Sequence, residues 1–182
     1  MDRRQSLPLV WLVSDERNDA RLEQTLRRLP SHSGFVYRHY HLDGDARRAR
    51  FRVLADLCAE KGHVAIVSGD AALASEYYAD GVYGPTERLG DDPLLLRCAT
   101  AHDAAEIDAA NAANVDAVFV SPVHETASHP GATPLGADGF RELAKRATMP
   151  AIALGGMNAE RAIALGARRW AAIAGLVQPQ RG

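Results

Sequence analysis

Short apolar runs alternate with segments of helical periodicity along the whole chain. The runs are four to nine residues long and rich in branched and aromatic side chains, which is typical of strands buried on both faces. Eight such runs occur, at residues 7–14, 34–42, 63–68, 81–84, 94–99, 116–122, 150–156 and 169–176. The pattern therefore predicts eight strands.

The segments between most runs carry apolar residues three and four positions apart, the spacing of an amphipathic helix. Helices are expected at residues 20–29, 46–62, 71–79, 102–114, 136–147 and 158–166, the second of them ended by Gly62. No helix fits between the fourth and fifth strands, and the sequence ends six residues after the eighth. Trp11 and Trp170 are expected to pack under helices.

Strands that are each followed by a helix favour a parallel sheet, because a parallel crossover needs a dozen or more residues. Eight such units predict that the sheet closes into a barrel. The expected fold class is α/β, a single-domain (β/α)8 TIM barrel over residues 1–182, trimmed because the helix after strand four is missing and the last helix is short or absent. An open doubly wound sheet is the alternative, but its glycine-rich first turn is replaced here by SDERND (14–19). A homodimer is one way to cover the side of the barrel that lacks a helix.

Composition narrows the range of partners. The formal net charge is −2 and both signs are interspersed, so nothing attracts nucleic acid or an anionic membrane surface. The apolar run at 7–13 is too short for a membrane span or a secretory signal. Cys58 and Cys98 lack metal-ligand spacing, which argues against zinc and favours reduced thiols. We expect a cytoplasmic protein with small-molecule ligands.

Barrel chemistry is expected at the carboxyl ends of the strands, with phosphate often held after strands seven and eight. Gly155 and Gly156 follow strand seven, where glycine lets the backbone approach a ligand closely, and Asn158 can cap the next helix. A plain strand-to-helix turn is the alternative interpretation. A second candidate loop, SPVHETASHPGATPLG (121–136), follows strand six.

Three motifs occur in order within residues 115–176, namely SPVHETASH, PLG and PAIALGG. They resemble the Gly-Pro-x-x-x-Thr-x-Thr-Lys loop, the Pro-Leu-Gly helix start and the Pro-x-x-Ala-Ile-Gly-Gly strand of the thiamine phosphate synthase and TenI-type thiazole tautomerase superfamily. Upstream, VYRHY (36–40) resembles its Gln-x-Arg-x-Lys strand, and VSGDAALASEYYADGVYG (67–84) its Asn-Asp segment with the following Ala-Asp-Gly-Val-His. The resemblance implies an eight-stranded barrel that handles a thiazole phosphate.

Family members with synthase activity couple a thiazole phosphate to hydroxymethylpyrimidine diphosphate, while Mg²⁺ and basic residues hold the departing diphosphate. The resemblance implies that Arg38 binds diphosphate and that Asp70 and Glu87 are the nearest equivalents of the ligands for Mg²⁺. Val36 and Tyr40 stand where the synthase pattern has Gln and Lys.

The thiazole-phosphate half of the pattern matches more closely. The resemblance implies that this phosphorylated substrate is bound by Thr126, Ser128, His129, Gly155 and Gly156.

Two histidines are candidate catalytic residues. His102 ends the run TAH, which corresponds to a Ser-x-His strand end of the family. The tautomerase motif Gly-His-Val-Phe-Glu-Thr corresponds to residues 121–126, where Glu125 and Thr126 agree and His124 stands two positions after the motif's histidine. Two positions along a strand return to the same face, and an imidazole titrates near neutral pH, as proton transfer requires.

Three functions remain open, in this order. The first is thiamine phosphate synthesis from phosphorylated thiazole and pyrimidine substrates. The second is a metal-independent, TenI-like thiazole tautomerase. The third is a non-catalytic barrel that binds a phosphorylated ligand.

Overall fold

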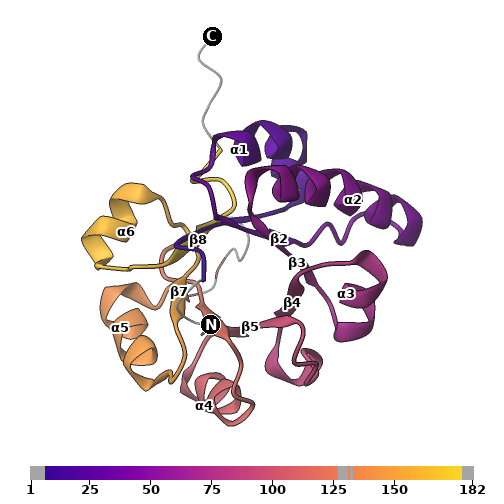
Figure 1. Ribbon diagram of the computed structural model, residues 1–182. Coiled ribbons are helices and arrows are strands. Elements are labelled where there is room, and N and C mark those ends of the chain that lie inside the picture. The colour runs from indigo at the N-terminus through magenta and orange to yellow at the C-terminus, as the bar shows by residue number, and fades with distance from the viewer. Residues whose placement is uncertain (1–6, 127–130, 132, 178–182) are drawn as a thin grey trace.

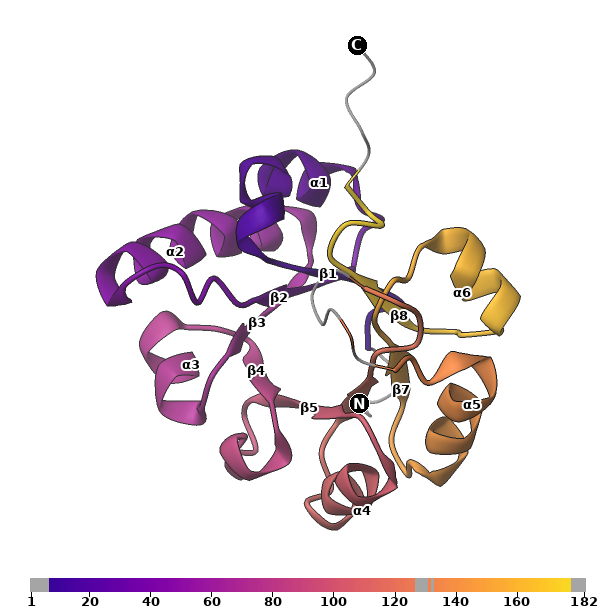
Figure 2. The same cartoon turned by 180° about the vertical axis from the view of Figure 1, so that it is seen from behind.

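Eight parallel strands close into a barrel in a computed structural model, which describes residues 7–126, 131 and 133–177. Each strand pairs with the next one along the chain, and β8 pairs with β1. Six α-helices of the described residues surround the ring, as Figures 1 and 2 show from opposite sides. The predicted (β/α)8 fold is confirmed.

The order of elements follows the predicted alternation. The strands are β1 (Val10–Val13), β2 (Gly34–Tyr37), β3 (Val64–Ser68), β4 (Gly81–Gly84), β5 (Leu96–Ala101), β6 (Ala117–Val120), β7 (Ala151–Ala153) and β8 (Trp170–Ala172). The helices are α1 (Leu22–Arg28), α2 (Gly44–Lys61), α3 (Ala71–Tyr77), α4 (Ala104–Ala112), α5 (Gly136–Arg146) and α6 (Ala159–Leu165). Two 3-10 turns, η1 (Glu16–Arg21) and η2 (Thr86–Arg88), complete the order. The short η2 stands where a helix was predicted to be missing, and the described residues after β8 form no helix.

Only β4 has its predicted bounds, and most of the other strands are shorter than predicted. Local turns explain two of these differences. The second strand ends at Tyr37 instead of reaching residue 42, because His39 adopts a φ of 37°, which interrupts extended backbone. The fifth strand begins at Leu96, two residues late, because the Asp92 carboxylate accepts a hydrogen bond from the Leu94 amide at 2.8 Å and closes a turn.

Aromatic side chains fill the barrel interior. Trp11, Phe119 and Tyr83 pack edge to face, with ring centroids 5.4 Å apart for the first pair and 5.1 Å for the second. A Cβ on Gly34 would lie 2.1 Å from the Trp11 ring, so glycine makes room for the indole. The expectation that Trp11 packs under a helix is wrong, because the pleat of β1 turns it inward; Trp170 lies in the helix-side core as expected.

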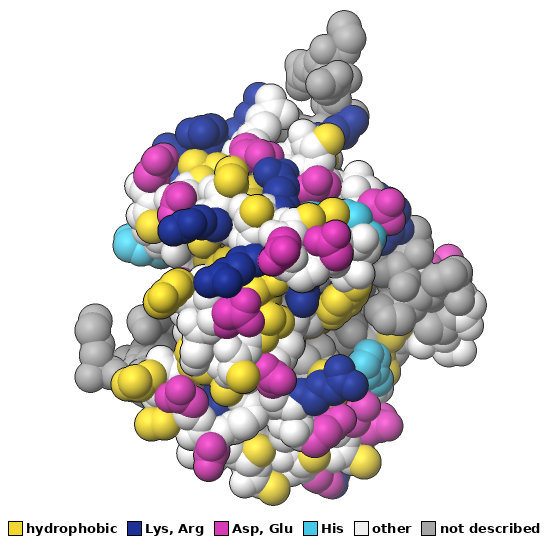
Figure 3. All heavy atoms as spheres, turned by 90° about the vertical axis from the view of Figure 1, so that its right-hand side faces the viewer, with side chains coloured by type: hydrophobic (Ala, Val, Ile, Leu, Met, Phe, Trp, Pro, Cys, Tyr) yellow, Lys and Arg dark blue, Asp and Glu magenta, His cyan; other side chains and the backbone are white. Residues whose placement is uncertain are grey.

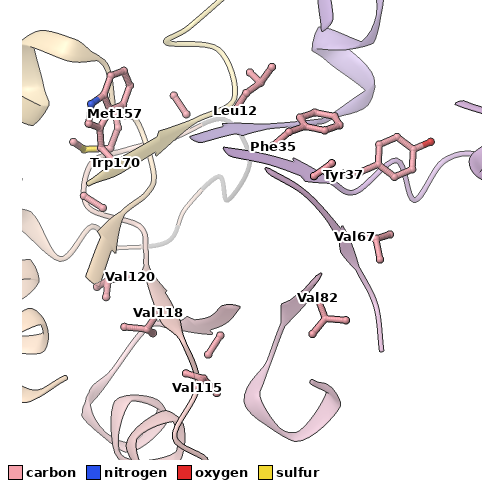
Figure 4. Packing of buried hydrophobic residues seen from close by; sticks show 14 of the residues in the cluster. Leu12, Phe35, Tyr37, Val67, Val82, Val115, Val118, Val120, Met157 and Trp170 are labelled. Carbon is pink, nitrogen blue, oxygen red and sulfur yellow. The ribbon is translucent and has the colours of Figure 1, made fainter. Parts of the chain in front are cut away.

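The second core lies between the strands and the surrounding helices. Leu12, Phe35, Tyr37, Val67 and Val82 point outward from their strands into this layer (Figure 4). Alternate residues of each short strand thus pack into two different cores. Because both sets are apolar, each strand appears in the sequence as a continuous apolar run.

The outer surface is hollowed between α2 and α3, where a cavity of about 630 Å³ lies on the side of the barrel shown in Figure 3. Charged and apolar side chains mix across this face. The link from β4 to β5, which lacks a helix, leaves Leu94 with 79 % of its surface exposed. Cover by a second copy of the chain stays a prediction.

Candidate active site at the barrel mouth

Two adjoining cavities open where the strands end. The first, here called the Arg38 cavity, has a volume of about 340 Å³ and is lined mainly by residues that end or follow β2 to β6. The second, the Asn158 cavity, has a volume of about 420 Å³ and lies between η1 and the loops after β7 and β8. Four residues line both cavities: Thr126, Leu154, Gly155 and Ile173. The carboxyl ends of the strands therefore carry one two-part site.

Arg38 is fixed at the wall of the first cavity by the end of β1. Its amide donates to Ser14 Oγ at 2.8 Å, and its Nε donates to the Ser14 carbonyl at 3.1 Å. Its guanidinium also lies 3.2 Å from the Asp15 carboxylate. Hydrogen bonds from Arg17 hold the pKa of Asp15 down at about 2, so Asp15 is ionised and shared by two arginines.

Tyr40 closes the same cavity from the loop after β2. Its hydroxyl lies 2.5 Å from Ser68 Oγ, and the Arg47 guanidinium lies 5.6 Å from its ring centroid. Arg47 of α2 also donates to the Arg38 carbonyl at 3.0 Å and to the Ser68 carbonyl at 2.8 Å, which joins the ends of β2 and β3. Where the synthase pattern has a flexible Lys, this chain places a braced aromatic side chain.

His102 and Arg88 also line the first cavity. His102 is exposed, and its Nδ1 lies 2.9 Å from the Glu106 carboxylate of α4. Arg88 comes from η2, and the sequence analysis missed it. The family resemblance pointed to its neighbour Glu87 instead. A 3-10 turn of three residues is too short to show a periodic pattern from which the direction of a side chain could be predicted.

The two predicted metal ligands do not line either cavity. The Asp70 carboxylate accepts from the Leu73 amide at 2.9 Å and caps α3, while Glu87 is exposed on η2. The described lining of the Arg38 cavity contains hydroxyls and cations but no carboxylate, and the described residues hold no cluster of three metal-ligating side chains. Mg²⁺ requires hard, usually anionic oxygen ligands, so this donor set does not fit it.

The two predicted glycines join the loops after β6 and β7. Gly155 has a φ of 97°, and a Cβ there would lie 2.7 Å from Pro122 Cα. The carbonyl of Gly155 accepts from the His124 amide at 3.1 Å. A Cβ on Gly156 would lie 2.6 Å from the Glu125 carbonyl. Glycine is therefore required for loop packing as well as for access to the cavities.

Of the five residues predicted to bind thiazole phosphate, the structure brings three together. Thr126 and Gly155 line both cavities, and Gly156 lines the Asn158 cavity. Ser128 and His129 lie outside the described residues. Arg17, Asn18 and Arg21 of η1 also line the Asn158 cavity and had no place in the sequence interpretation.

His124 lies beside this site without lining it. Its Cβ is close to Gly156, and burial, with a smaller contribution from Arg161, lowers the pKa of its imidazole. Its Nε2 is buried and has no hydrogen-bond partner among the described residues. The two candidate catalytic histidines are therefore separated: His102 lines the Arg38 cavity, and His124 lines neither cavity.

None of the helices in the described ranges has the length and apolar character needed to cross a bilayer.

Comparisons of the sequence with known proteins agree on one family. A family model described as "Thiamine monophosphate synthase" matches residues 10–176. The chain is 31 % identical over 153 residues to a thiamine-phosphate synthase of Prochlorococcus marinus, covering 78 % of this chain and 43 % of that protein. It is 32 % identical over 157 residues to one of Nostoc punctiforme, covering 80 % and 44 %. The chain thus spans less than half the length of these curated relatives.

Solved structures agree in fold. A thiamine phosphate pyrophosphorylase from Pyrococcus furiosus superposes with a TM-score of 0.81 at 20 % identity, over 98 % of this chain and 91 % of the other. One from Bacteroides thetaiotaomicron gives 0.60 at 15 % identity, over 91 % and 82 %.

Proposed function

Because this chain belongs to the thiamine monophosphate synthase family, we propose that it joins a phosphorylated thiazole to hydroxymethylpyrimidine diphosphate, giving thiamine phosphate and diphosphate. The observation that supports this most is the pair of adjoining cavities, which offers separate places for two substrates around the shared residues Thr126 and Gly155. Relatives named thiamine-phosphate synthase support the same reaction.

In this reaction the carbon–oxygen bond to diphosphate breaks with its electron pair leaving on oxygen, and the thiazole nitrogen lone pair forms the new carbon–nitrogen bond. The protein must hold the negative charge of the departing group and keep water away from the cationic carbon. Arg38 and Arg88 supply positive charge and hydrogen-bond donors on one side of the first cavity, and His102 adds an imidazole there. Buried Tyr83 and Leu154 supply a wall without free charge.

The thiazole phosphate is assigned to the Asn158 cavity. Thr126 offers a hydroxyl there, and Gly155 and Gly156 hold the loop backbone at its edge. Arg17 and Arg21 supply positive charge from η1 on the opposite side. In this proposal the thiazole ring lies near Thr126, at the junction with the Arg38 cavity.

Thiamine phosphate synthases in general depend on Mg²⁺. The described donors do not fit that ion, and no step of the proposed reaction is assigned to it. The same observation favours a second candidate, the TenI-like tautomerase, since moving a proton on the thiazole needs no metal. His124, which would act as its acid and base, does not line either cavity, so the coupling reaction remains the first proposal.

The test is incubation of the purified chain with both substrates, with and without Mg²⁺, and quantification of thiamine phosphate by mass spectrometry. Formation of thiamine phosphate is the expected result. Its absence at saturating substrates, together with proton exchange on the thiazole measured by NMR, would replace the first proposal by the second. A thermal shift with thiazole phosphate in the absence of both activities would indicate a binding barrel.

A further inference from the structure

Two arginines and one histidine line the Arg38 cavity, but they are not equally available to a ligand. Arg38 is paired with Asp15 at 3.2 Å, and His102 lies 2.9 Å from Glu106. The guanidinium of Arg88 makes no hydrogen bond or ion pair within the described residues. The charge that is not already balanced by a carboxylate therefore lies on η2.

The backbone around Arg88 is well anchored although its side chain is not. The Arg88 amide donates to the Pro85 carbonyl at 3.0 Å, and the Leu89 amide donates to the Thr86 carbonyl at 3.3 Å. Leu89 is 1 % exposed and belongs to the helix-side core. A buried leucine beside it thus fixes the point from which the arginine reaches the cavity.

The two acids predicted to bind Mg²⁺ in this region do not line the cavity. Asp70 is occupied in capping α3, and Glu87 is exposed and outside the cavity lining. A guanidinium group can bind phosphate oxygens directly through paired N–H donors, and it needs no divalent ion for this. The element on which the family resemblance places a metal ligand therefore presents a cation to the cavity instead.

We propose that Arg88, with Arg38, holds the phosphate or diphosphate group of the ligand directly, so that this cavity binds its anion without a divalent metal. The inference rests on the proposed function only in taking the ligand to be an organic phosphate. It assigns to Arg88 the charge neutralisation that Mg²⁺ would otherwise supply.

The probe is inorganic pyrophosphate, titrated calorimetrically into the purified full chain in EDTA and again with excess Mg²⁺. Binding in EDTA is expected, at an affinity equal to or higher than with Mg²⁺. Arg88→Ala is expected to weaken it by about tenfold or more, and Arg88→Lys by less, since Lys keeps the charge but not the paired donors. Arg28→Ala, an exposed arginine of α1, is the matched control and is expected to bind as the wild type does.

The thermal midpoint of Arg88→Ala is expected to equal that of the wild type, because the side chain has no described partner to lose. Binding that requires Mg²⁺ and is lost in Glu87→Gln but kept in Arg88→Ala would overturn the inference. Thiamine phosphate formation at the wild-type rate by Arg88→Ala would also overturn it and leave the proposed function standing. Arg88-dependent binding of pyrophosphate in EDTA supports the inference even where no coupling is detected.

Discussion

The Nε2 atom of His39 lies 2.8 Å from Oδ1 of Asp19. Because an ionised carboxylate only accepts, the imidazole carries its hydrogen on Nε2. On the other side of the ring, Nδ1 lies 2.8 Å from Ser14 Oγ, which already accepts from the Arg38 amide. In the neutral imidazole Nδ1 is then an acceptor, so the serine hydroxyl donates to it, and this tautomer satisfies every group in the chain of hydrogen bonds.

These hydrogen bonds connect the end of β1 with the loop after β2 and with η1, and the last two of these segments carry cavity residues. Burial is the largest influence on the pKa of His39 and lowers it; Asp19 raises the pKa, His41 and Arg50 lower it, and the net shift is downward. Burial alone would raise the pKa of Asp19, but hydrogen bonds from His39 and Arg50 lower it. Both shifts favour the neutral imidazole and the ionised carboxylate, a state with which the hydrogen-bond geometry agrees.

The free energy of unfolding is expected to fall as the pH is lowered from about 7 to about 5.5. Below the ordinary histidine pKa of about 6.5 the unfolded chain takes up a proton that folded His39 does not yet accept, so acid favours unfolding. Urea denaturation at both pH values measures the slope. His39→Gln is expected to reduce it, and an unchanged slope in that variant would contradict the assignment. His124, whose pKa burial also lowers, accounts for part of the remaining slope.

Ser14→Ala is expected to lower the free energy of unfolding by about 1–3 kcal/mol, because it leaves the buried His39 Nδ1 and the Arg38 amide without their partner. The KM for the pyrimidine diphosphate is also expected to rise, since Arg38 loses its fixed position. Denaturation and steady-state kinetics measure the two effects. Ser31→Ala, at an exposed position, is the control, and an equally small effect at both positions would show that the hydrogen-bond chain does not hold Arg38.

Sequence pattern was sufficient for the barrel because both faces of every strand are buried. Val36 and Tyr37, adjacent in β2, pack into different cores, which makes the run continuously apolar and easy to recognise. The same continuity hides which face a residue takes. Trp11 was assigned to the wrong core because an apolar run carries no sign of its pleat.

The candidate site was only partly predictable. Thr126, Gly155 and Gly156 were found because a strand end followed by a family motif fixes their place. Arg88 and the Asp70 cap depend on the course of individual loops, where one residue of shift moves a side chain from the cavity to solvent. Distances within such loops follow from three-dimensional packing and leave no periodic signal.

Gly155→Ala is expected to destabilise the fold by about 2 kcal/mol or more, because an L-residue at a φ of 97° is strained and the added Cβ would overlap Pro122. Gly44→Ala is the matched control, since its Cβ meets nothing within 4 Å and α2 gains a better helix former. Thermal unfolding compares the two variants. Equal thermal midpoints for the two variants would contradict this, because they would mean that the loops after β6 and β7 can move apart without destabilising the fold.

Tyr40→Phe is expected to raise the KM for the pyrimidine diphosphate while kcat and stability stay nearly constant. The change removes the hydrogen bond to Ser68 from a side chain that is already 68 % exposed, so little folding energy is lost but one cavity wall is no longer braced. Tyr78→Phe, with 90 % exposure and outside both mouth cavities, serves as the control in the same kinetic assay. A fall in kcat alone would instead place the hydroxyl in the chemical step.

His124→Ala separates the two candidate reactions. The His124 side chain is half-buried, with its Cβ beside Gly156, and it lines neither cavity, so coupling of the two substrates is expected to proceed with unchanged KM and kcat. A tautomerase that used this imidazole as its acid and base would lose proton exchange on the thiazole in the same variant. Both readouts come from one preparation, with product formation followed by mass spectrometry and exchange by NMR. Loss of coupling with exchange intact would contradict both assignments, because it would place His124 in the reaction for which the geometry gives it no contact.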